Sequence, residues 1–391
     1  MGNGTKGSLS RWSRVPLAAA ALAMAAAPDR VLAASVTDAP SIRATPVEVQ
    51  RVVGDLAHPW GIAFLPDGSF LVTERPGRLT LVPAGATEAV PVDGVPAVYA
   101  NGQGGLLDVA IDPSFASNRL VYLSYAEEGP GGAGTAVARG TLSIGEGEAA
   151  LRNVETIFRQ TPKVAGGRHF GARLMFAPDG TLFVGLGDRG RDAEAQDAGN
   201  TIGTLVRIHP DGRVPSDNPF VGRSGVRPEI WSIGHRNIQG ADIDPATGRI
   251  VTVEHGARGG DEINVPLAGR NYGWPVISYG RQYSGAPIGE GTAKAGLEQP
   301  VYYWDPSIAP SGLVVYDGDL FPGWRGDIVV GALRAQRLVR LAFENGRVTG
   351  EEVLLDGAIG RIRDVEVAPD GSLYLLTDDA NGSVYRLTPR G

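Results

Sequence analysis

The chain of 391 residues contains no cysteine and only five histidines. The absence of cysteine excludes disulfide bonds, a thiolate nucleophile, iron–sulfur clusters and cysteine-ligated zinc. Any covalent or redox chemistry therefore depends on other residues or on a bound group.

Clusters of basic residues are also missing. The formal net charge is −7, from 43 acidic and 36 basic residues, and no long run of basic residues occurs. A negatively charged protein without a basic cluster has no surface that would attract a polyanion, so nucleic-acid binding is not expected. Turn residues are abundant instead, with 56 glycines and 28 prolines in a sequence that is still 42% hydrophobic. Many turns around a substantial core predict an all-β protein.

Residues 1–34 are predicted to be a secretory signal peptide. Basic residues precede an apolar stretch over residues 15–27, and small residues follow it up to Ala34. The apolar stretch is shorter than the ~20 residues that a spanning helix needs, so no membrane span is expected. We expect cleavage near Ala34, a flexible lead-in at residues 35–45 and a periplasmic or secreted protein.

One unit recurs along the chain: an apolar strand, a turn rich in Pro, Asp and Gly, and a second apolar strand. Period-2 strands that flank such turns are typical of β-hairpins. The units are GIAFLPDGSFLVTER (61–75), LLDVAIDPSFASNRLVYLSY (106–125), ARLMFAPDGTLFVGLGD (172–188), GADIDPATGRIVTVEHG (240–256), LVVYDGDLFPGWRGDIVVGAL (313–333) and DVEVAPDGSLYLLTDD (364–379).

Hairpins at this spacing, with short strands between them, predict four-stranded antiparallel blades arranged around an axis. The predicted fold is a six-bladed β-propeller that forms one domain over residues 46–391. Residues 46–56 are expected to pair with residues 383–389 and close the ring. A pair of β-sandwiches is the alternative.

Polar residues recur at one position of the repeat. Residues equally far before and after a hairpin turn lie side by side at its open end, so His169 and Asp188 are expected to meet there. Segments 191–229 and 275–310 leave from the same end and could wall a pocket. The alternative is that these polar residues are ordinary strand ends in solvent. The other residues expected around this mouth of the channel are Gln103, Arg236, Asn237, Arg361 and Arg363.

A histidine beside a carboxylate is an oriented base, and His169 with Asp188 makes such a pair. Several arginines at the same mouth indicate a ligand with more than one carboxylate or phosphate, because a guanidinium pairs bidentately with such groups. No GxSxG motif supplies a nucleophile. The electron acceptor or electrophile is therefore expected to be bound.

Three further patterns are weaker indications of function. The turn EHGARGGDE (254–262) offers oxygens that suit Ca²⁺, although a solvated glycine-rich loop would look the same. The segment GLGDRG (185–190) fits the dinucleotide fingerprint but lacks its βαβ context, so a dinucleotide site is not expected. Five tryptophans are expected to be packing anchors between blades: Trp60, Trp231, Trp274, Trp304 and Trp324.

Several segments, taken in order, resemble the soluble aldose sugar dehydrogenases that depend on pyrroloquinoline quinone (PQQ), relatives of soluble glucose dehydrogenase. The resemblance runs from about Leu56 to the C-terminus. It implies a six-bladed propeller that holds PQQ over the channel with Ca²⁺ and oxidises aldoses at C1 to lactones. The segments are HPWGIAFLPDGSFLVTER, GQGGLLDVAIDP, RHFGARLMFAPDGTLFVGLGD, IGHRNIQG, DEINVPLAGRNYGWP and GRIRDVEVAPDG.

The resemblance also implies residue roles. His169 is implied to be the base that removes the anomeric hydroxyl proton as hydride passes to the quinone C5, with Asp188 as its orienting carboxylate. Arg236 is implied to stabilise the developing negative charge on the quinone oxygen. The residues implied to contact the cofactor are Gln103, Arg236, Asn237, Ser307, Arg334, Arg361 and Arg363.

For calcium, the resemblance implies a site on the backbone carbonyls of Gly256 and Ala257, where the ion would polarise the quinone. It implies a second, structural calcium site at Glu262 and Tyr272. Two cofactor positions depart from the glucose dehydrogenases, which have a lysine at the position of Arg334 and a threonine at the position of Ser307. Both replacements keep the charge or the hydroxyl.

Two other functions stay open at this point. One is a Ca²⁺-dependent propeller lactonase or esterase in which His169 activates water, and the other is a non-catalytic propeller that binds glycans. For a dehydrogenase, the expected partners are an aldose sugar and an external electron acceptor, either a quinone or a redox protein. The protein itself is expected to be a monomer or a homodimer.

Overall fold

Antiparallel sheets make up nearly all of the regular structure. A computed structural model of the chain describes residues 1–2, 39–145 and 147–391, and most of the predicted signal peptide lies outside these residues. The all-β class is confirmed. None of the helices in the described residues has the length and hydropathy needed to cross a bilayer. Those helices are α1 (Phe115–Asn118), η1 (Asp192–Gln196) and η2 (Pro322–Trp324).

Within the described residues, four sheets have four strands each. The first contains β1 (Val47–Leu56), β24 (Gly382–Pro389), β23 (Leu373–Thr377) and β22 (Ile362–Val367). The second contains β10 (Gly171–Phe176), β11 (Leu182–Leu186), β12 (Thr204–Ile208) and β13 (Ile230–Ile233). The third contains β14 (Ile238–Ile243), β15 (Ile250–Glu254), β16 (Asp261–Asn264) and β17 (Tyr302–Trp304). The fourth contains β18 (Pro310–Val315), β19 (Ile328–Ala332), β20 (Arg337–Glu344) and β21 (Arg347–Leu354).

The remaining sheet has eight strands. Its two four-stranded runs are joined by a short parallel pairing in which Val92 lies opposite Ala149. One run is β2 (Pro59–Phe64), β3 (Phe70–Glu74), β4 (Arg78–Val82) and β5 (Val90–Asp93). The other is β9 (Ala149–Arg159), β8 (Gly132–Ile144), β7 (Leu120–Gly129) and β6 (Leu106–Ile111).

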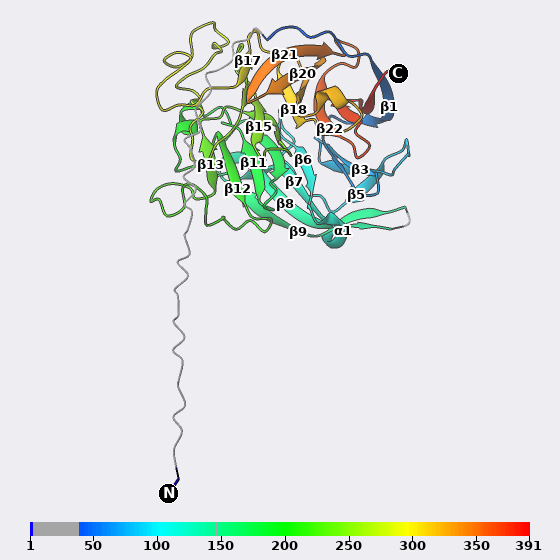
Figure 1. The fold of residues 1–391 in the computed structure, drawn as a ribbon, viewed down its shortest axis with the longest axis horizontal. Coiled ribbons are helices and arrows are strands. Elements are labelled where there is room, and N and C mark those ends of the chain that lie inside the picture. Colours follow the sequence, from blue (N-terminus) through cyan, green and yellow to red (C-terminus); the bar gives the residue numbers. More distant parts are fainter. Residues whose placement is uncertain (3–38, 146) are drawn as a thin grey trace. The chain divides into compact units, whose positions relative to one another are not determined.

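The strands that begin the predicted hairpins form a ring. Every predicted hairpin is present, as the antiparallel pairs β2/β3, β6/β7, β10/β11, β14/β15, β18/β19 and β22/β23. In chain order each first strand contacts the next, from β2 through β6, β10, β14 and β18 to β22, and β22 contacts β2 again. The predicted closing pair is present: β1 pairs with β24, with Val47 opposite Pro389, and lies beside the red C-terminal strand in Figure 1.

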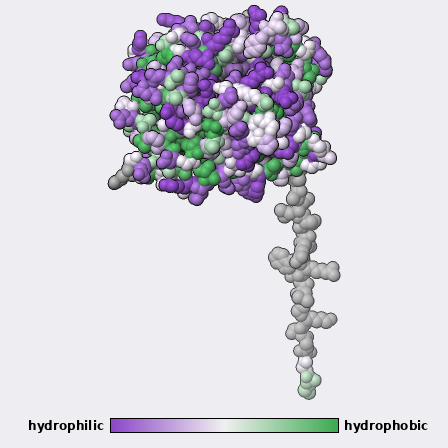
Figure 2. Space-filling view, turned by 180° about the vertical axis from the view of Figure 1, so that it is seen from behind, coloured by the Kyte–Doolittle hydropathy of each residue, from purple (hydrophilic) through white to green (hydrophobic). Residues whose placement is uncertain are grey.

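The core lies between the faces of neighbouring sheets. One cluster joins Val253 and Tyr302 of the β14–β17 sheet to Val330 and Leu341 of the β18–β21 sheet, and all four side chains are buried. Another fills the space between the two halves of the eight-stranded sheet. The apolar strand faces are thus buried mainly against one another. The face in Figure 2 is mixed, with hydrophilic residues over much of it and smaller hydrophobic patches among them.

The residues before β1 follow the edge of another sheet. Residues 39–45 belong to the expected lead-in, and here the amide of Ile42 donates to the carbonyl of Glu351 in β21 (2.8 Å) while the amide of Glu351 donates to the carbonyl of Pro40 (3.0 Å). Because β21 is an edge strand, its outer hydrogen-bonding groups are available to such a segment.

Each of the ring hairpins has a register shift near the start of its first strand. In β14, for example, the shift lies between Ile238 and Gly240. An extra residue in one strand of a pair bends the strand and re-aims its side chains. Several predicted site residues lie at or just before these shifts: Gln103, His169, Arg236, Asn237, Ser307, Arg361 and Arg363.

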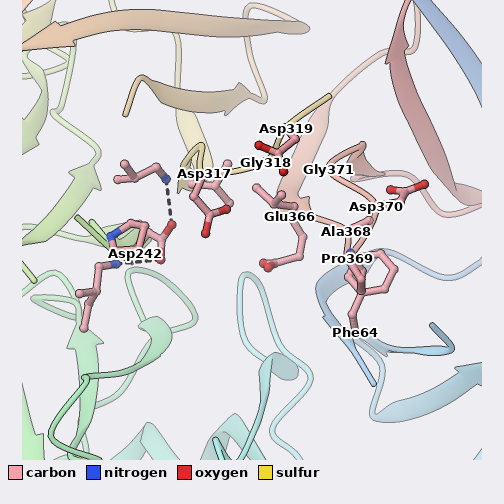
Figure 3. A pocket seen from close by; sticks show the side chains of 15 residues that line it. Phe64, Asp242, Asp317, Gly318, Asp319, Glu366, Ala368, Pro369, Asp370 and Gly371 are labelled. Atoms are coloured by element: carbon pink, nitrogen blue, oxygen red, sulfur yellow. Dashed lines mark hydrogen bonds between the residues drawn. The ribbon is translucent and has the colours of Figure 1, made fainter. Parts of the chain in front are cut away.

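Carboxylates collect along the ring strands toward their other ends. Arg173 of β10 bridges Asp108 of β6 (3.1 Å) and Asp364 of β22 (2.9 Å), which ties three sheets together across the channel. Beyond this bridge, a pocket of about 530 Å³ is lined by Asp242 and Glu366, both labelled in Figure 3. Burial raises the pKa of Asp242 to about 7, and burial with the neighbouring carboxylates raises that of Glu366 well above its ordinary value.

The folded protein thus binds a proton at Asp242 more tightly than the unfolded chain, whose Asp pKa is about 3.8. The stability contributed by protonated Asp242 is present in acid and is lost as pH rises from about 4 to 7. We predict that Asp242→Asn raises the melting temperature relative to the wild type more at pH 8 than at pH 5. Asp319→Asn, at a fully exposed side chain, is the control that should show no such difference. A variant whose relative stability falls between pH 5 and pH 8 would contradict the assignment.

Candidate active site

His169 and Asp188 meet at the open end of the β10/β11 hairpin. His169 precedes β10 and Asp188 follows β11, and the imidazole Nδ1 lies 2.7 Å from Asp188 Oδ1. The amide of His169 donates to Oε1 of Gln103 (2.7 Å), which brings in a residue from the preceding hairpin. A Cβ at Gly187 would lie 1.9 Å from the carbonyl oxygen of His169. Only glycine at this position therefore allows the two segments to approach so closely.

The contact with Asp188 determines which nitrogen of His169 can act as a base. Nδ1 donates to the carboxylate, so Nε2 is the free basic nitrogen. Burial acts to raise the pKa of Asp188, but hydrogen bonds from His169 and from the amide of Gly190 outweigh it, and the pKa lies below its usual value. Burial lowers the pKa of His169, with the charge of Arg236 adding to the effect, so the imidazole is neutral and able to accept a proton near pH 7.

Arg236 is held beside this pair with a buried donor left unpaired. Its carbonyl accepts from the amide of Asp188 (2.8 Å), its amide donates to Glu254 Oε2 (2.6 Å), and its Nη1 donates to the carbonyl of His255 (3.2 Å). The residue is 7% exposed, and its buried Nε has no hydrogen-bond partner among the described residues. A buried N–H without a partner is costly, and a ligand that accepts from it would remove that cost.

A path of hydrogen-bonded side chains links Asn237, the neighbour of Arg236, to Arg363 in the sheet that contains β22. Oδ1 of Asn237 accepts from the amide of Gly171 (3.1 Å) and lies 3.4 Å from Nε2 of Gln239. Oε1 of Gln239 in turn accepts from Nη1 of Arg363 (3.1 Å). Residues from three different hairpins thus share one hydrogen-bonded path.

Arg361 and Arg363 share one carboxylate. Their Nη2 atoms lie 2.9 Å and 3.0 Å from Oδ2 of Asp378. Burial acts to raise the pKa of Asp378, but the two guanidiniums outweigh it and hold the pKa well below its usual range. Since one negative charge faces two positive charges, this part of the mouth keeps a net positive charge.

Asp261 joins two segments at the same end of the structure. Its Oδ2 accepts from Oγ of Ser307 (2.7 Å) and from the next two backbone amides (2.8 Å and 3.0 Å). Its Oδ1 accepts from the amide of Gly256 (2.9 Å). Arg334 is exposed, with Nη1 3.5 Å from the carbonyl of Ser307. The Ser307 hydroxyl thus helps to hold its own loop.

Three of the four residues expected to bind metal line one small cavity: Gly256, Glu262 and Tyr272. The Tyr272 hydroxyl donates to the carbonyl of Val265 (2.7 Å), while burial and the nearby Glu254 raise the pKa of Glu262 well above its ordinary value. Within the described part of the chain, no group of three or more His, Asp or Glu side chains is arranged to hold a metal ion. A cation here would therefore depend on backbone carbonyls and on a ligand.

Trp274 contributes more than the packing expected from the sequence. Its Nε1 donates to Oδ2 of Asp188 (2.8 Å), which places the indole within the hydrogen-bond network of His169 and Asp188. Asp261 and Gln239 were also missed as organising residues. Trp274 lies in none of the repeated hairpins, so their phase could not place it. Gln239 lies two residues after Asn237, at the start of the same hairpin, and could have been found from that spacing.

The chain is similar to sugar dehydrogenases over most of its length. The model of the glucose/sorbosone dehydrogenase family matches residues 56–386. The aldose sugar dehydrogenase of Escherichia coli (strain K12) is 45% identical over 348 residues, covering 88% of this chain and 93% of that protein. The crystal structure of the soluble E. coli aldose sugar dehydrogenase in its apo-form has a TM-score of 0.85 at 45% identity and covers 88% of this chain and 100% of that one. The PQQ-bound aldose sugar dehydrogenase of Streptomyces coelicolor has a TM-score of 0.74 at 30% identity and covers 90% of this chain and 100% of that one.

The fold, the site and these similarities define an oxidoreductase that acts on sugars and is built as a β-propeller. The family match spans most of the chain and includes every residue of the mouth described above. The chain belongs to the glucose/sorbosone dehydrogenase family.

The contacts of Asp261 generate a test of the site's architecture. In Asp261→Asn, a single oxygen replaces two, so the side chain cannot accept from both the Gly256 amide and the Ser307 segment. Leaving a buried donor unsatisfied costs about 1–3 kcal/mol. We predict a corresponding loss in the free energy of unfolding, measured by denaturant titration. Asp356→Asn, which removes only an exposed pair with Arg337, should change it little. Equal stability of both variants would show that Asp261 does not anchor the loop.

Proposed function

We propose that this protein oxidises aldose sugars at C1 to lactones, with PQQ as the bound hydride acceptor and Ca²⁺ beside it. The observation that carries the proposal is the unpartnered, buried Nε of Arg236 next to the oriented base His169. A base for a hydroxyl proton and a donor for a ligand oxygen thus face the same mouth. The PQQ-bound state named for the S. coelicolor relative supports the choice of cofactor.

The residues at the mouth fit an anionic quinone. Arg361 and Arg363 share the carboxylate of Asp378 as an ion-pair partner, and the buried Nε of Arg363 has no partner among the described residues. Both guanidiniums can therefore pair with carboxylates of a ligand. The remaining proposed cofactor contacts come from hairpin ends and from the loop fixed by Asp261: Gln103, Asn237, Ser307 and Arg334.

When bound, PQQ would supply a quinone that accepts the hydride from the sugar carbon. The work of the chain is then to move one proton and to stabilise charge. Nε2 of His169 takes the proton of the anomeric hydroxyl, and Asp188 stabilises the imidazolium that forms. The guanidinium of Arg236 stabilises negative charge that develops on a ligand oxygen, in a site where burial strengthens the interaction.

For calcium, we propose the backbone carbonyls of Gly256 and Ala257 as protein ligands in the active site. Carbonyl oxygens are ligands that Ca²⁺ prefers. Glu262 and Tyr272 belong to a proposed second site with a structural role. The raised pKa of the Glu262 carboxyl is the response expected of an acid that is buried without a compensating cation.

The finer architecture is part of the same proposal. We take each half of the eight-stranded sheet as one blade, so that the propeller has six blades, and we take residues 46–391 as its single domain. We propose that residues 1–34 are a cleaved signal peptide and that the enzyme works in the periplasm or outside the cell. There, as a monomer or homodimer, it would pass electrons to a quinone or redox protein.

Reconstitution tests the proposed function directly. We predict that the chelator-treated protein oxidises aldoses with an electron-accepting dye only when PQQ and Ca²⁺ are both added. PQQ with chelator, Ca²⁺ alone and NAD⁺ with Ca²⁺ are the controls. Chelator-sensitive ester hydrolysis without PQQ, together with no sugar oxidation, would instead identify a lactonase.

Replacement of the base tests the assignment of His169. Removal of a general base costs about 10²-fold or more in rate. We therefore predict at least this loss of kcat for His169→Ala in the reconstituted enzyme, followed by dye reduction. His209→Ala, at a turn histidine outside the site, is the matched control. Full activity in His169→Ala would rule out the proposed mechanism.

A further inference from the structure

Trp274 contacts two of the proposed catalytic residues. Its indole Nε1 donates to Oδ2 of Asp188 at 2.8 Å, while the guanidinium carbon of Arg236 lies 5.1 Å from the centre of its ring. The side chain also belongs to a buried cluster that includes Ala257, whose carbonyl is a proposed calcium ligand. The residue is 7% exposed. One rigid, buried ring thus contacts Asp188 and Arg236 and shares a buried cluster with the loop that is proposed to bind calcium.

The backbone of Trp274 is fixed as firmly as its ring. Its amide donates to the carbonyl of Gly234 (2.9 Å), and its carbonyl accepts from Nε2 of Gln196 (2.6 Å). Gly234 lies two residues before Arg236, so the hydrogen bond ties the ring to the segment that carries the arginine. The position of the indole is therefore set by contacts other than those with the His169–Asp188 pair.

The two oxygens of Asp188 have separate donors. Oδ1 accepts from His169 Nδ1 and from the amide of Gly190, and Oδ2 accepts from Trp274. Without the indole, Oδ2 would be a buried acceptor without this donor, and the carboxylate could turn about its terminal torsion, which is soft. A rotated carboxylate would no longer hold the imidazole at one angle.

We propose that Trp274 is a positioning residue that fixes the Asp188 carboxylate, and through it the His169 base, relative to the Arg236 guanidinium. The proposal rests on the proposed sugar oxidation for its catalytic meaning. The contacts themselves do not depend on that function. An indole suits the task because it combines a large rigid surface, a single donor and a face that attracts a cation.

Trp274→Phe tests the proposal, because it keeps an aromatic ring and removes the donor. With less of its charge neutralised, Asp188 stabilises protonated His169 more strongly, so the pKa of His169 rises. We expect the His169 imidazole signals of the cofactor-free full chain to titrate at higher pH in the variant, measured by NMR. In the reconstituted enzyme, we expect kcat/KM to fall about ten-fold or more and its acidic limb to move to higher pH.

Trp231→Phe is the matched control. Like that of Trp274, the indole of Trp231 donates a hydrogen bond, but to the backbone carbonyl of Pro266 (3.3 Å), and the guanidinium carbon of Arg207 lies 5.4 Å from its ring centre. It lies outside the site, so this variant should leave the His169 titration unchanged. An unchanged titration and pH profile in Trp274→Phe, with only a lower melting temperature, would overturn the proposal.

A measurement on the wild type removes the dependence on a folded variant. The indole N–H signal of Trp274 should shift with pH at the same midpoint as the His169 imidazole, because both donate to the same carboxylate. No shift at that midpoint would overturn the proposal. Since these spectra need no cofactor, failure of the wild type to oxidise sugars would reject the proposed function while leaving the role of Trp274 tested.

Discussion

Closure of the ring is the constraint on which the site depends. β1 comes from the start of the described fold and completes the sheet that contains the last three strands, and β22 of that sheet contacts β2. With the ring closed, Arg363 at the start of β22 reaches Gln239, although 124 positions separate them in the chain. Arg173 makes a second link across the channel, to Asp364. Closure thus brings the arginine pair of the β22/β23 hairpin into one hydrogen-bonded network with residues of the β14/β15 hairpin.

The two ends of the ring strands have opposite chemistry. At the end where the register shifts occur, arginines outnumber their carboxylate partners and a neutral histidine is held by a buried aspartate. At the other end, burial and nearby carboxylates raise the pKa values of Asp242 and Glu366. The proposed anionic cofactor would be attracted to the first end, where positive charge is in excess. The charge distribution thus selects one mouth of an otherwise repetitive fold.

Local chemistry explains how much the sequence could reveal. Turn residues between alternating strands predicted the hairpins, and the fixed register of a hairpin predicted that His169 would meet Asp188. Contacts between hairpins and loops were out of reach, because nothing local specifies them. The parallel β5–β9 pairing, the strands β12 and β17 inside supposed inter-repeat segments, and the donor role of Trp274 are examples. The cofactor itself came from resemblance to a family, since arginines alone indicate only an anion.

If one mouth of the ring holds both the cofactor and the base, a crystal of the protein soaked with PQQ and Ca²⁺ will show it. We expect density for the quinone in contact with Arg236, with its carboxylates toward Arg361 and Arg363 and with His169 facing the open side. Density at the acidic mouth instead, or an unchanged basic mouth at saturating PQQ, would rule out this arrangement.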